Sequence, residues 1–418
     1  MNDILSFWAQ WLRPSAGLPT VQWSLLLAVA AVTGYLCQRH TGLPKVVGYS
    51  LVGTVAGLAG FSGAVWPLQG IGLFLLELGV SIVLFECGAR IPLRWFRHNP
   101  MVLVQSIAES ALTYFAVYWV LVWLDVPTRV AGPLALVALA ASPAVLTRVV
   151  ADTRAAGPVT ERAIVLATLS TLYALTLGSA RAEQINRQSI TLLDTVYPVV
   201  VVLGVSIIVA AVLSLLLRVA LRFMSPTSEN TSMLLLALIA AGTAVAAHMG
   251  GSAPLAALLG GMLLKQLNPR PWAWPRQLGN ASSLLTMLMF VLVSTVAAQA
   301  DWSGPVAGVV LALIAVRLIA KAVGVGLGNV GSGASWRQAL WVGCAMTPMS
   351  SIALLIASQF VVASPSTGHL ISRVALPAIL LMEVLGAVIA TVAVYRAGES
   401  SKPWAPLSRG GNGDTREP

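Results

Sequence analysis

The sequence predicts an all-α polytopic membrane protein with about thirteen transmembrane helices, and three observations lead to this fold class. The chain has 418 residues, of which 57% are hydrophobic and 10% charged, whereas about 25% of the residues in a soluble domain are charged. Apolar stretches of about 20 residues, the length that spans a bilayer as a helix, recur along the chain. These stretches lack the alternating pattern of membrane β-strands and are too long for them.

The predicted spans occupy residues 22–396. The second and ninth are short and rich in glycine, so the count of about thirteen depends on them. An N-terminal segment, 1–21, precedes the spans, and we expect no removable signal peptide there. Residues 397–418 are rich in proline, glycine and charge, and we expect a disordered cytoplasmic tail. In order, the predicted spans are 22–38, 43–61, 68–89, 100–124, 131–150, 159–180, 193–222, 231–249, 252–267, 281–299, 304–328, 337–361 and 370–396.

The net charge of +10 is interpreted as an orientation signal rather than as a nucleic-acid-binding surface. With the carboxyl terminus inside, seventeen Lys and Arg residues fall in cytoplasmic segments and five in outer segments. This excess follows the positive-inside rule. It predicts an N-terminus outside and a C-terminus in the cytoplasm, as in a protein of the bacterial inner (plasma) membrane. We expect a lipid bilayer around the chain and no nucleic-acid partner.

The sequence contains no motif of a catalytic or ATP-driven protein. It has neither a P-loop nor a Rossmann fingerprint, and its His and Cys residues lack the spacing of a metal site. The three cysteines are Cys37, Cys87 and Cys344, in or beside apolar spans, and they form no CxxC pair or disulfide framework. We therefore expect no enzyme activity, no cofactor and no metal centre.

Two of the predicted spans are interrupted near the middle by small and polar residues around a proline. The span 131–150 is broken at Pro143, and the span 337–361 is broken at Pro348. Proline removes a backbone donor from a helix, and unpaired backbone groups are tolerated at membrane depth only beside protein or a water-filled cavity. A pair of broken helices in the two halves of a chain indicates the binding site of a secondary transporter.

Two landmarks recur at a nearly constant offset and indicate an internal repeat. Pro143 and Pro348 are 205 residues apart, and Pro44 and Pro254, each near the start of a short span, are 210 residues apart. Spans 1–6 and 8–13 are therefore predicted to be related, with span 7 between them. Because a shift by seven spans reverses direction, the two repeats are predicted to be inverted in the membrane. The alternative is coincidence, since proline and glycine are common in transmembrane helices.

Several charged residues fall inside predicted spans, where each costs about 2.5–3.5 kcal/mol on insertion scales, and seven of them are candidates for a functional or structural role. Lys321 lies deep in an apolar span, where it either takes and releases a proton or forms a static salt bridge. Glu109 and Glu383 are candidate proton or cation carriers, or else structural partners of the basic residues. Arg148 stays protonated, so it is a fixed charge that pairs with Glu109 or caps the broken helix. The other three are Glu77, Glu86 and Arg317, of which the last two are also placed to reach an interface.

Short segments spread over residues 22–396 carry a resemblance to a known family. They read LPKVVGY at 43–49, LELGV and LFECG within 76–88, APLAALLGGMLL at 253–264, RLIAK at 317–321 and MEVLG at 382–386. In order and spacing they resemble the monovalent cation:proton antiporter-2 family, within the sodium/proton exchanger superfamily. The resemblance implies a dimerisation (panel) domain, a mobile core domain, alternating access, exchange of Na⁺ or K⁺ for H⁺, and a homodimer. It also implies that the broken helices cross in the core, which would bring together Ser142, Pro143, Thr147, Thr347, Pro348 and Ser350.

The chain departs from this family on the sixth span, where the family has an essential Asp. No carboxylate occurs from Ala163 to Ala180, and the matching position is about Thr171, beside Ser170. A hydroxyl group is able to coordinate a cation through its lone pairs, but it does not give up a proton near neutral pH. Competition between a cation and a proton for one carboxylate therefore has no acid at this position.

Three functional hypotheses follow. The first is a proton-coupled monovalent cation antiporter with a displaced acid, in which Glu109 or Glu383 supplies the carboxylate and Lys321 the counter-charge. In this hypothesis the neutral oxygens come from Ser142, Thr147, Ser170, Thr171 and Thr347. The second keeps the fold but carries an anionic organic solute, bound by Lys321 and Arg148. The third is a transport-inactive member that serves as a sensor or assembly protein.

Overall fold

Each predicted span corresponds to one helix, or to two consecutive helices, in a computed structural model of the chain. The structure describes residues 19–61, 66–68, 70–91, 93–185, 192–225, 228–268, 276–300, 302 and 304–401. Within these ranges there is no strand, and an isolated bridge pairs Ala155 with Ser400. The helices are α2 (Pro19–Thr41), α3 (Lys45–Leu58), α4 (Gly70–Ala89), α5 (Leu93–His98), α6 (Met101–Trp123), α7 (Thr128–Leu139), α8 (Pro143–Thr153), α9 (Pro158–Gln184), α10 (Leu192–Phe223), α11 (Glu229–His248), α12 (Ala253–Leu267), α13 (Arg276–Ala298), α14 (Gly304–Leu327), α15 (Trp336–Ala345), α16 (Ser351–Ala363) and α17 (Pro365–Arg396).

The helices have the length and composition expected of a membrane protein. In the part of the chain that the structure describes, eight helical segments are long and apolar enough to cross a membrane, one of them formed by α7 and α8 together. Shorter apolar helices include α3, α12 and α16. The predicted all-helical membrane fold is therefore confirmed, while the number of thirteen crossings stays a prediction. The short helix α5, between α4 and α6, was not expected from the sequence.

Both predicted helix breaks are present. The segment 140–142 separates α7 from α8, and the segment 346–350 separates α15 from α16. Ser142 is the N-cap of α8, because its hydroxyl accepts a hydrogen bond from the backbone N–H of Val145 at 3.4 Å. Pro143 takes the first helical position, where a backbone N–H would have no acceptor within the helix, so its absence costs no hydrogen bond. The two breaks thus begin new helices instead of only bending old ones.

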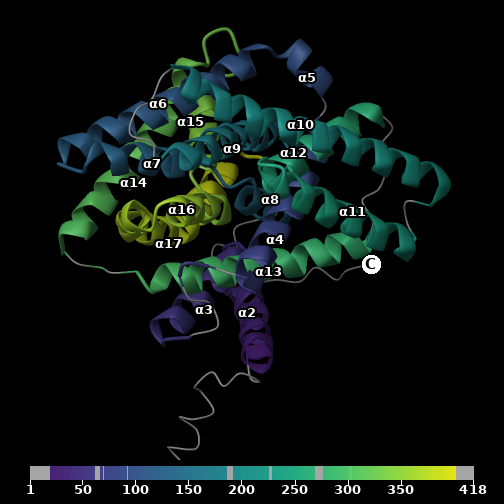
Figure 1. Ribbon diagram of the computed structural model, residues 1–418, viewed down its shortest axis with the longest axis horizontal. Coiled ribbons are helices and arrows are strands. Elements are labelled where there is room, and N and C mark those ends of the chain that lie inside the picture. The colour runs from purple at the N-terminus through teal and green to yellow at the C-terminus, as the bar shows by residue number, and fades with distance from the viewer. Residues whose placement is uncertain are drawn as a thin grey trace, which may run out of the picture.

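Two groups of helices account for most of the packing, and α13 contacts both (Figure 1). In one group α12 packs against α4, α10 and α11; in the other α14 packs against α6, α15 and α17. Glycines allow the closest approach in the first group. A Cβ atom at Gly88 would collide with the carbonyl of Leu258, and one at Gly261 with the carbonyl of Phe85. Both breaks lie in or beside the second group, because α15 belongs to it and α7 packs against α6 and α17.

The chain beyond α17 returns to the connection between α8 and α9. The Glu399 carboxylate accepts hydrogen bonds from the backbone N–H groups of Val159 and Thr160, each at 2.7 Å. Residues 398–401, which the sequence assigns to the tail, are thus held at the N-terminus of α9. The segments 1–18 and 402–418 lie outside the described residues, and so does the prediction of disorder for the remaining tail.

The contact between Glu399 and α9 leads to a prediction about stability. A side chain that caps a helix N-terminus contributes about 1 kcal/mol, so we expect Glu399→Ala to lower the free energy of unfolding by about this amount. The measurement is the thermal midpoint of the detergent-purified protein. Glu161→Ala is the control, because Glu161 lies in the first turn of the same helix with an exposed side chain. Equal midpoints for the two variants would contradict the cap.

Candidate functional site

Arg317 on α14 connects the two helix breaks. Its side chain is fully buried, and its guanidinium donates hydrogen bonds to the carbonyls of Ala138 at 2.7 Å and Ala140 at 2.9 Å. It also donates to the carbonyls of Thr347 at 2.5 Å and Pro348 at 3.5 Å. A broken helix leaves carbonyls without intrahelical donors, and the planar fork of an arginine offers five N–H groups. Arg317 is therefore a buried structural residue rather than an interfacial one.

Lys321 lies one helical turn after Arg317 and faces the same region. Its ammonium is 2.5 Å from Glu109 Oε1 on α6, 3.3 Å from the Leu139 carbonyl and 3.4 Å from Ser170 Oγ. Both charged side chains are fully buried. The sequence left open whether Glu109 pairs with Lys321 or with Arg148. In the structure Glu109 pairs with Lys321. The ion pair sits at the end of the first half of the broken helix.

Glu109 has further partners on its own helix. Ser110 Oγ donates to Glu109 Oε2 at 3.1 Å, and Thr113 Oγ1 donates to Glu109 Oε1 at 3.2 Å. The approach of α14 to α6 depends on Gly324, because a Cβ atom there would lie 2.5 Å from the Glu109 Cα. The small residue at position 324 thus brings the carboxylate within reach of the ammonium.

The two hydroxyl residues of α9 bind the backbone of the first break. Ser170 Oγ donates to the Leu139 carbonyl at 2.8 Å, and Thr171 Oγ1 donates to the Ala141 carbonyl at 3.1 Å. Thr171 also donates to the Ala167 carbonyl of its own helix at 2.8 Å. The structure therefore brings Ser170 to Lys321, while Thr171 holds the break in position.

Arg148 does not join this site. It lies on α8 and donates to Ser283 Oγ at 3.0 Å and Thr286 Oγ1 at 3.2 Å, both on α13. Together with Thr147 and Glu86 it lines a separate cavity of about 210 Å³ between α4, α8 and α13. Arg148 is thus bound to hydroxyl groups rather than to Glu109.

The remaining predicted residues belong to the second break and to α17. Thr347 Oγ1 donates to the Cys344 carbonyl at 2.8 Å, so its hydroxyl turns back to its own helix. Ser350 is buried and its hydroxyl has no hydrogen-bond partner. Glu383 is buried on α17, where Ser50 of α3 donates a hydrogen bond to it, so it does not belong to the Lys321 pair.

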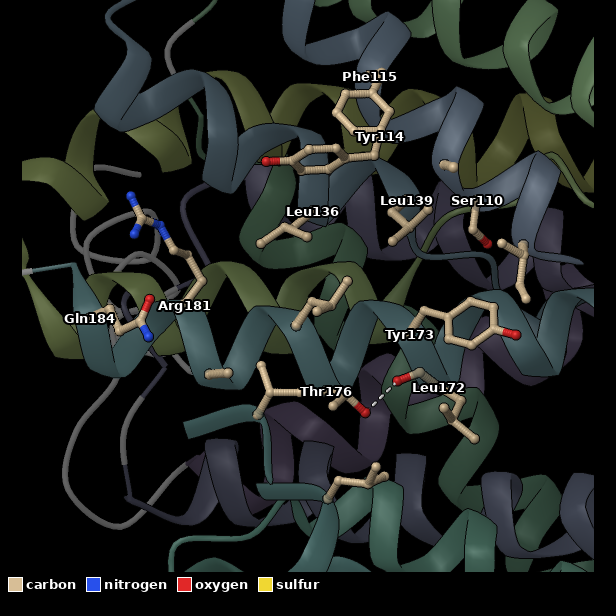
Figure 2. A pocket seen from close by; sticks show the side chains of 16 residues that line it. Ser110, Tyr114, Phe115, Leu136, Leu139, Leu172, Tyr173, Thr176, Arg181 and Gln184 are labelled. Carbon is tan, nitrogen blue, oxygen red and sulfur yellow. Dashed lines mark hydrogen bonds between the residues drawn. The ribbon is translucent and has the colours of Figure 1, made fainter. Parts of the chain in front are cut away.

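A cavity of about 720 Å³ extends from one end of α9 toward the ion pair (Figure 2). Arg181 and Gln184 lie at one end of the cavity, and Ser110 and Leu139 lie toward the other (Figure 2). The lining between them is apolar and aromatic, with Tyr114 among its side chains. Since Ser110 donates to Glu109 and the Leu139 carbonyl accepts from Lys321, the cavity ends beside the pair.

No group of three or more His, Cys, Asp or Glu residues arranged for a metal ion occurs among the described residues. The oxygen atoms around Lys321 come instead from one carboxylate, one carbonyl and one hydroxyl.

Comparison with known proteins gives a family and a fold. The transmembrane sodium/hydrogen exchanger family matches residues 27–396. No curated protein sequence matches the chain. One similar solved structure is the sodium proton antiporter MjNhaP1 from Methanocaldococcus jannaschii at pH 8, with 15% identity, a TM-score of 0.67, and coverage of 91% of this chain and 98% of that chain. An electron-microscopy structure of the same antiporter has 17% identity, a TM-score of 0.66 and coverage of 93% and 100%. The predicted fold class is therefore confirmed.

The role of Arg317 leads to a prediction about stability. We expect Arg317→Met to lower the free energy of unfolding by about 3 kcal/mol or more, because each buried carbonyl left without a donor costs about 1–3 kcal/mol. Arg317→Lys should have an intermediate effect, since a single ammonium group cannot donate to the carbonyls of both breaks as the planar guanidinium does. The thermal midpoint in detergent measures the effect of each variant. Arg129→Met is the control, because the Arg129 side chain is exposed. A midpoint for Arg317→Met equal to that of the control would contradict this role.

Proposed function

This chain belongs to the sodium/hydrogen exchanger family, and we propose that it exchanges a monovalent cation, Na⁺ or K⁺, for protons by alternating access. As a member of that family it is an integral membrane transporter and not an enzyme. The observation that carries the proposal is the fully buried ion pair of Lys321 and Glu109 beside the first helix break. It supplies a carboxylate from α6 where the family's acid on the sixth span is missing.

The ammonium of Lys321 occupies a position that suits a monovalent cation. Three oxygens surround it, from the Glu109 carboxylate, the Leu139 carbonyl and the Ser170 hydroxyl. Oxygen ligands of these kinds are those that hard cations bind. A cation that enters carries the same charge as the ammonium, so it takes over the role of counter-ion to Glu109.

Exchange follows from the balance of charge at this site. A second positive charge next to the ammonium would leave an uncompensated charge in a buried region, which is costly. Lys321 therefore releases its proton when a cation binds, and the cation leaves when Lys321 takes a proton back. The site then holds either one cation or one extra proton, and this alternation couples the two fluxes.

The geometry supports this exchange better than the alternative of an anionic solute. That hypothesis needs Lys321 and Arg148 in one site, but Lys321 is neutralised by Glu109 and Arg148 is bound to Ser283 and Thr286 on α13. A transport-inactive member would need no oxygen-lined pair next to a cavity. The anionic-solute alternative therefore loses the observation that favoured it.

Access and movement complete the proposal. The cavity that ends at Ser110 and Leu139 offers one route to the pair. We propose that the group with α6–α9 and α14–α17 acts as the mobile core and that α2–α4 and α10–α13 form the panel of a homodimer. The chain would lie in the bacterial inner membrane, with its N-terminus outside and its C-terminus in the cytoplasm.

Proton flux in proteoliposomes tests the proposal. An internal pH dye should report a pH change on pulses of Na⁺, K⁺ or Li⁺, and Lys321→Arg and Glu109→Gln should reduce it to the level of protein-free liposomes. Arginine keeps the positive charge but cannot release a proton. Lys321→Arg therefore keeps the ion pair with Glu109 and removes the proposed proton release. Glu161→Gln, at the exposed start of α9, is the control. Unchanged exchange in folded Lys321→Arg protein would overturn the mechanism.

A further inference from the structure

Glu383 is a buried carboxylate that the exchange at Lys321 does not use. It lies near the middle of α17 and is fully buried. Ser50 Oγ on α3 donates to Glu383 Oε1 at 3.0 Å, and Glu383 Oε2 has no hydrogen-bond partner. Carboxylate oxygens that are both buried and unpartnered are rare in folded proteins. The environment of Glu383 therefore needs an explanation of its own.

Unpartnered hydroxyl groups from two other segments surround the same carboxylate. Ser294 of α13 and Ser350 of the second break both face Glu383. Each is buried, and neither hydroxyl has a hydrogen-bond partner of normal geometry. The neighbouring Ser351 hydroxyl is also buried and unpartnered. Polar atoms from four parts of the chain thus converge on one point, and among them the contact of Ser50 with Glu383 is a hydrogen bond of normal geometry.

Two glycines bring these segments together. A Cβ atom at Gly386 would lie 2.5 Å from the Pro348 Cα, so this glycine lets α17 contact the second break. A Cβ atom at Gly53 would lie 2.5 Å from the Val291 carbonyl and 2.9 Å from the Ser294 Cβ. Gly53 therefore lets α3 lie directly against α13. Close backbone packing therefore holds each of these two pairs of segments, and the hydrogen bond from Ser50 to Glu383 joins one pair to the other.

No positive charge balances Glu383 in the described part of the chain. No ion pair joins it to a basic side chain there. The basic groups of neighbouring helices have other partners: Lys321 binds Glu109, Arg317 binds the carbonyls of the breaks, and Arg148 binds α13. An isolated carboxylate in a buried, low-dielectric region is strongly unfavourable. It must be neutralised by a proton or by a bound cation.

We propose that Glu383 and the hydroxyl groups of Ser50, Ser294 and Ser350 form a second binding site for a monovalent cation. One carboxylate balances one positive charge, and hydroxyl oxygens complete the coordination of a hard cation such as Na⁺ or Li⁺. The site is distinct from the Lys321 pair, because its ligands come from α3, α13, α17 and the second break. It goes beyond the proposed exchange, since cation binding here requires no transport at Lys321.

Equilibrium dialysis of the full-length, detergent-purified protein against radiolabelled Na⁺ tests the site, with choline to hold ionic strength. Glu383→Gln should bind about one Na⁺ fewer per chain than the wild type, because one carboxylate charge is removed. In the wild-type protein, excess Li⁺ should displace the one Na⁺ whose binding depends on Glu383, whereas excess choline should not displace it. An equal amount of bound Na⁺ in folded Glu383→Gln and wild-type protein would overturn the proposal.

A second pair of variants leaves the carboxylate in place. Ser350→Ala should weaken Na⁺ binding about tenfold, which corresponds to about 1.4 kcal/mol. Ser358→Ala is the matched control, because Ser358 is equally buried but donates to the Leu355 carbonyl of its own helix. Equal affinities in these two variants would contradict the assignment of Ser350 and overturn the proposed site.

The test also separates this site from the proposed exchange. Na⁺ binding that depends on Glu383 in a Lys321→Arg protein would support the second site, whether or not that protein exchanges protons. Loss of this binding in Lys321→Arg would overturn the independence of the two sites. Full exchange in Lys321→Arg would contradict only the mechanism at Lys321.

Discussion

The need to satisfy backbone carbonyls at two helix breaks determines much of this structure. Unwinding at 140–142 and at 346–350 frees carbonyl groups inside an apolar protein, where an unpaired polar group costs several kcal/mol. Arg317 donates to carbonyls of both breaks and so fixes α14 beside them. Lys321 follows four residues later and therefore lies on the same face of α14. The ion pair with Glu109 is thus placed by a structural requirement of the breaks.

The buried charges differ in how they are compensated, and this difference separates structural from exchangeable groups. Arg317 is surrounded by carbonyl oxygens, which carry no formal charge. These oxygens therefore attract a competing cation less strongly than a carboxylate does. Lys321 shares its carboxylate with no other basic residue in the described chain, and in the proposed exchange its charge is the one that a cation replaces. Glu383 has hydroxyl groups around it but no basic partner there. The two acids therefore have different chemistry although both are fully buried.

The sequence predicted the elements well because their signals are local. Runs of apolar residues marked each span, and Pro143 and Pro348 marked both breaks, since proline acts on its own helix. The choice of partners was not predictable in this way. The pairing of Glu109 with Lys321 depends on the contact of α6 with α14 at Gly324. The serines around Glu383 lie at positions 50, 294 and 350, so no local pattern connects them. The sequence leaves an interfacial position open for Arg317, because the carbonyls that it binds become available only in the folded breaks.

In the exchange that we propose, the absence of an acid on the sixth span changes which group carries the proton. In this chain α9 contributes Ser170 and Thr171, which donate to carbonyls of the first break and hold it in position. The carboxylate comes from α6, where it is already paired with an ammonium. In the proposed exchange the proton that moves therefore belongs to Lys321, and Glu109 supplies the negative charge that either the ammonium or the cation balances. Cation binding and proton release then occur at different atoms of one site. Because the cation replaces the ammonium charge, Glu109 remains neutralised throughout, and neither state leaves an isolated charge in the buried region.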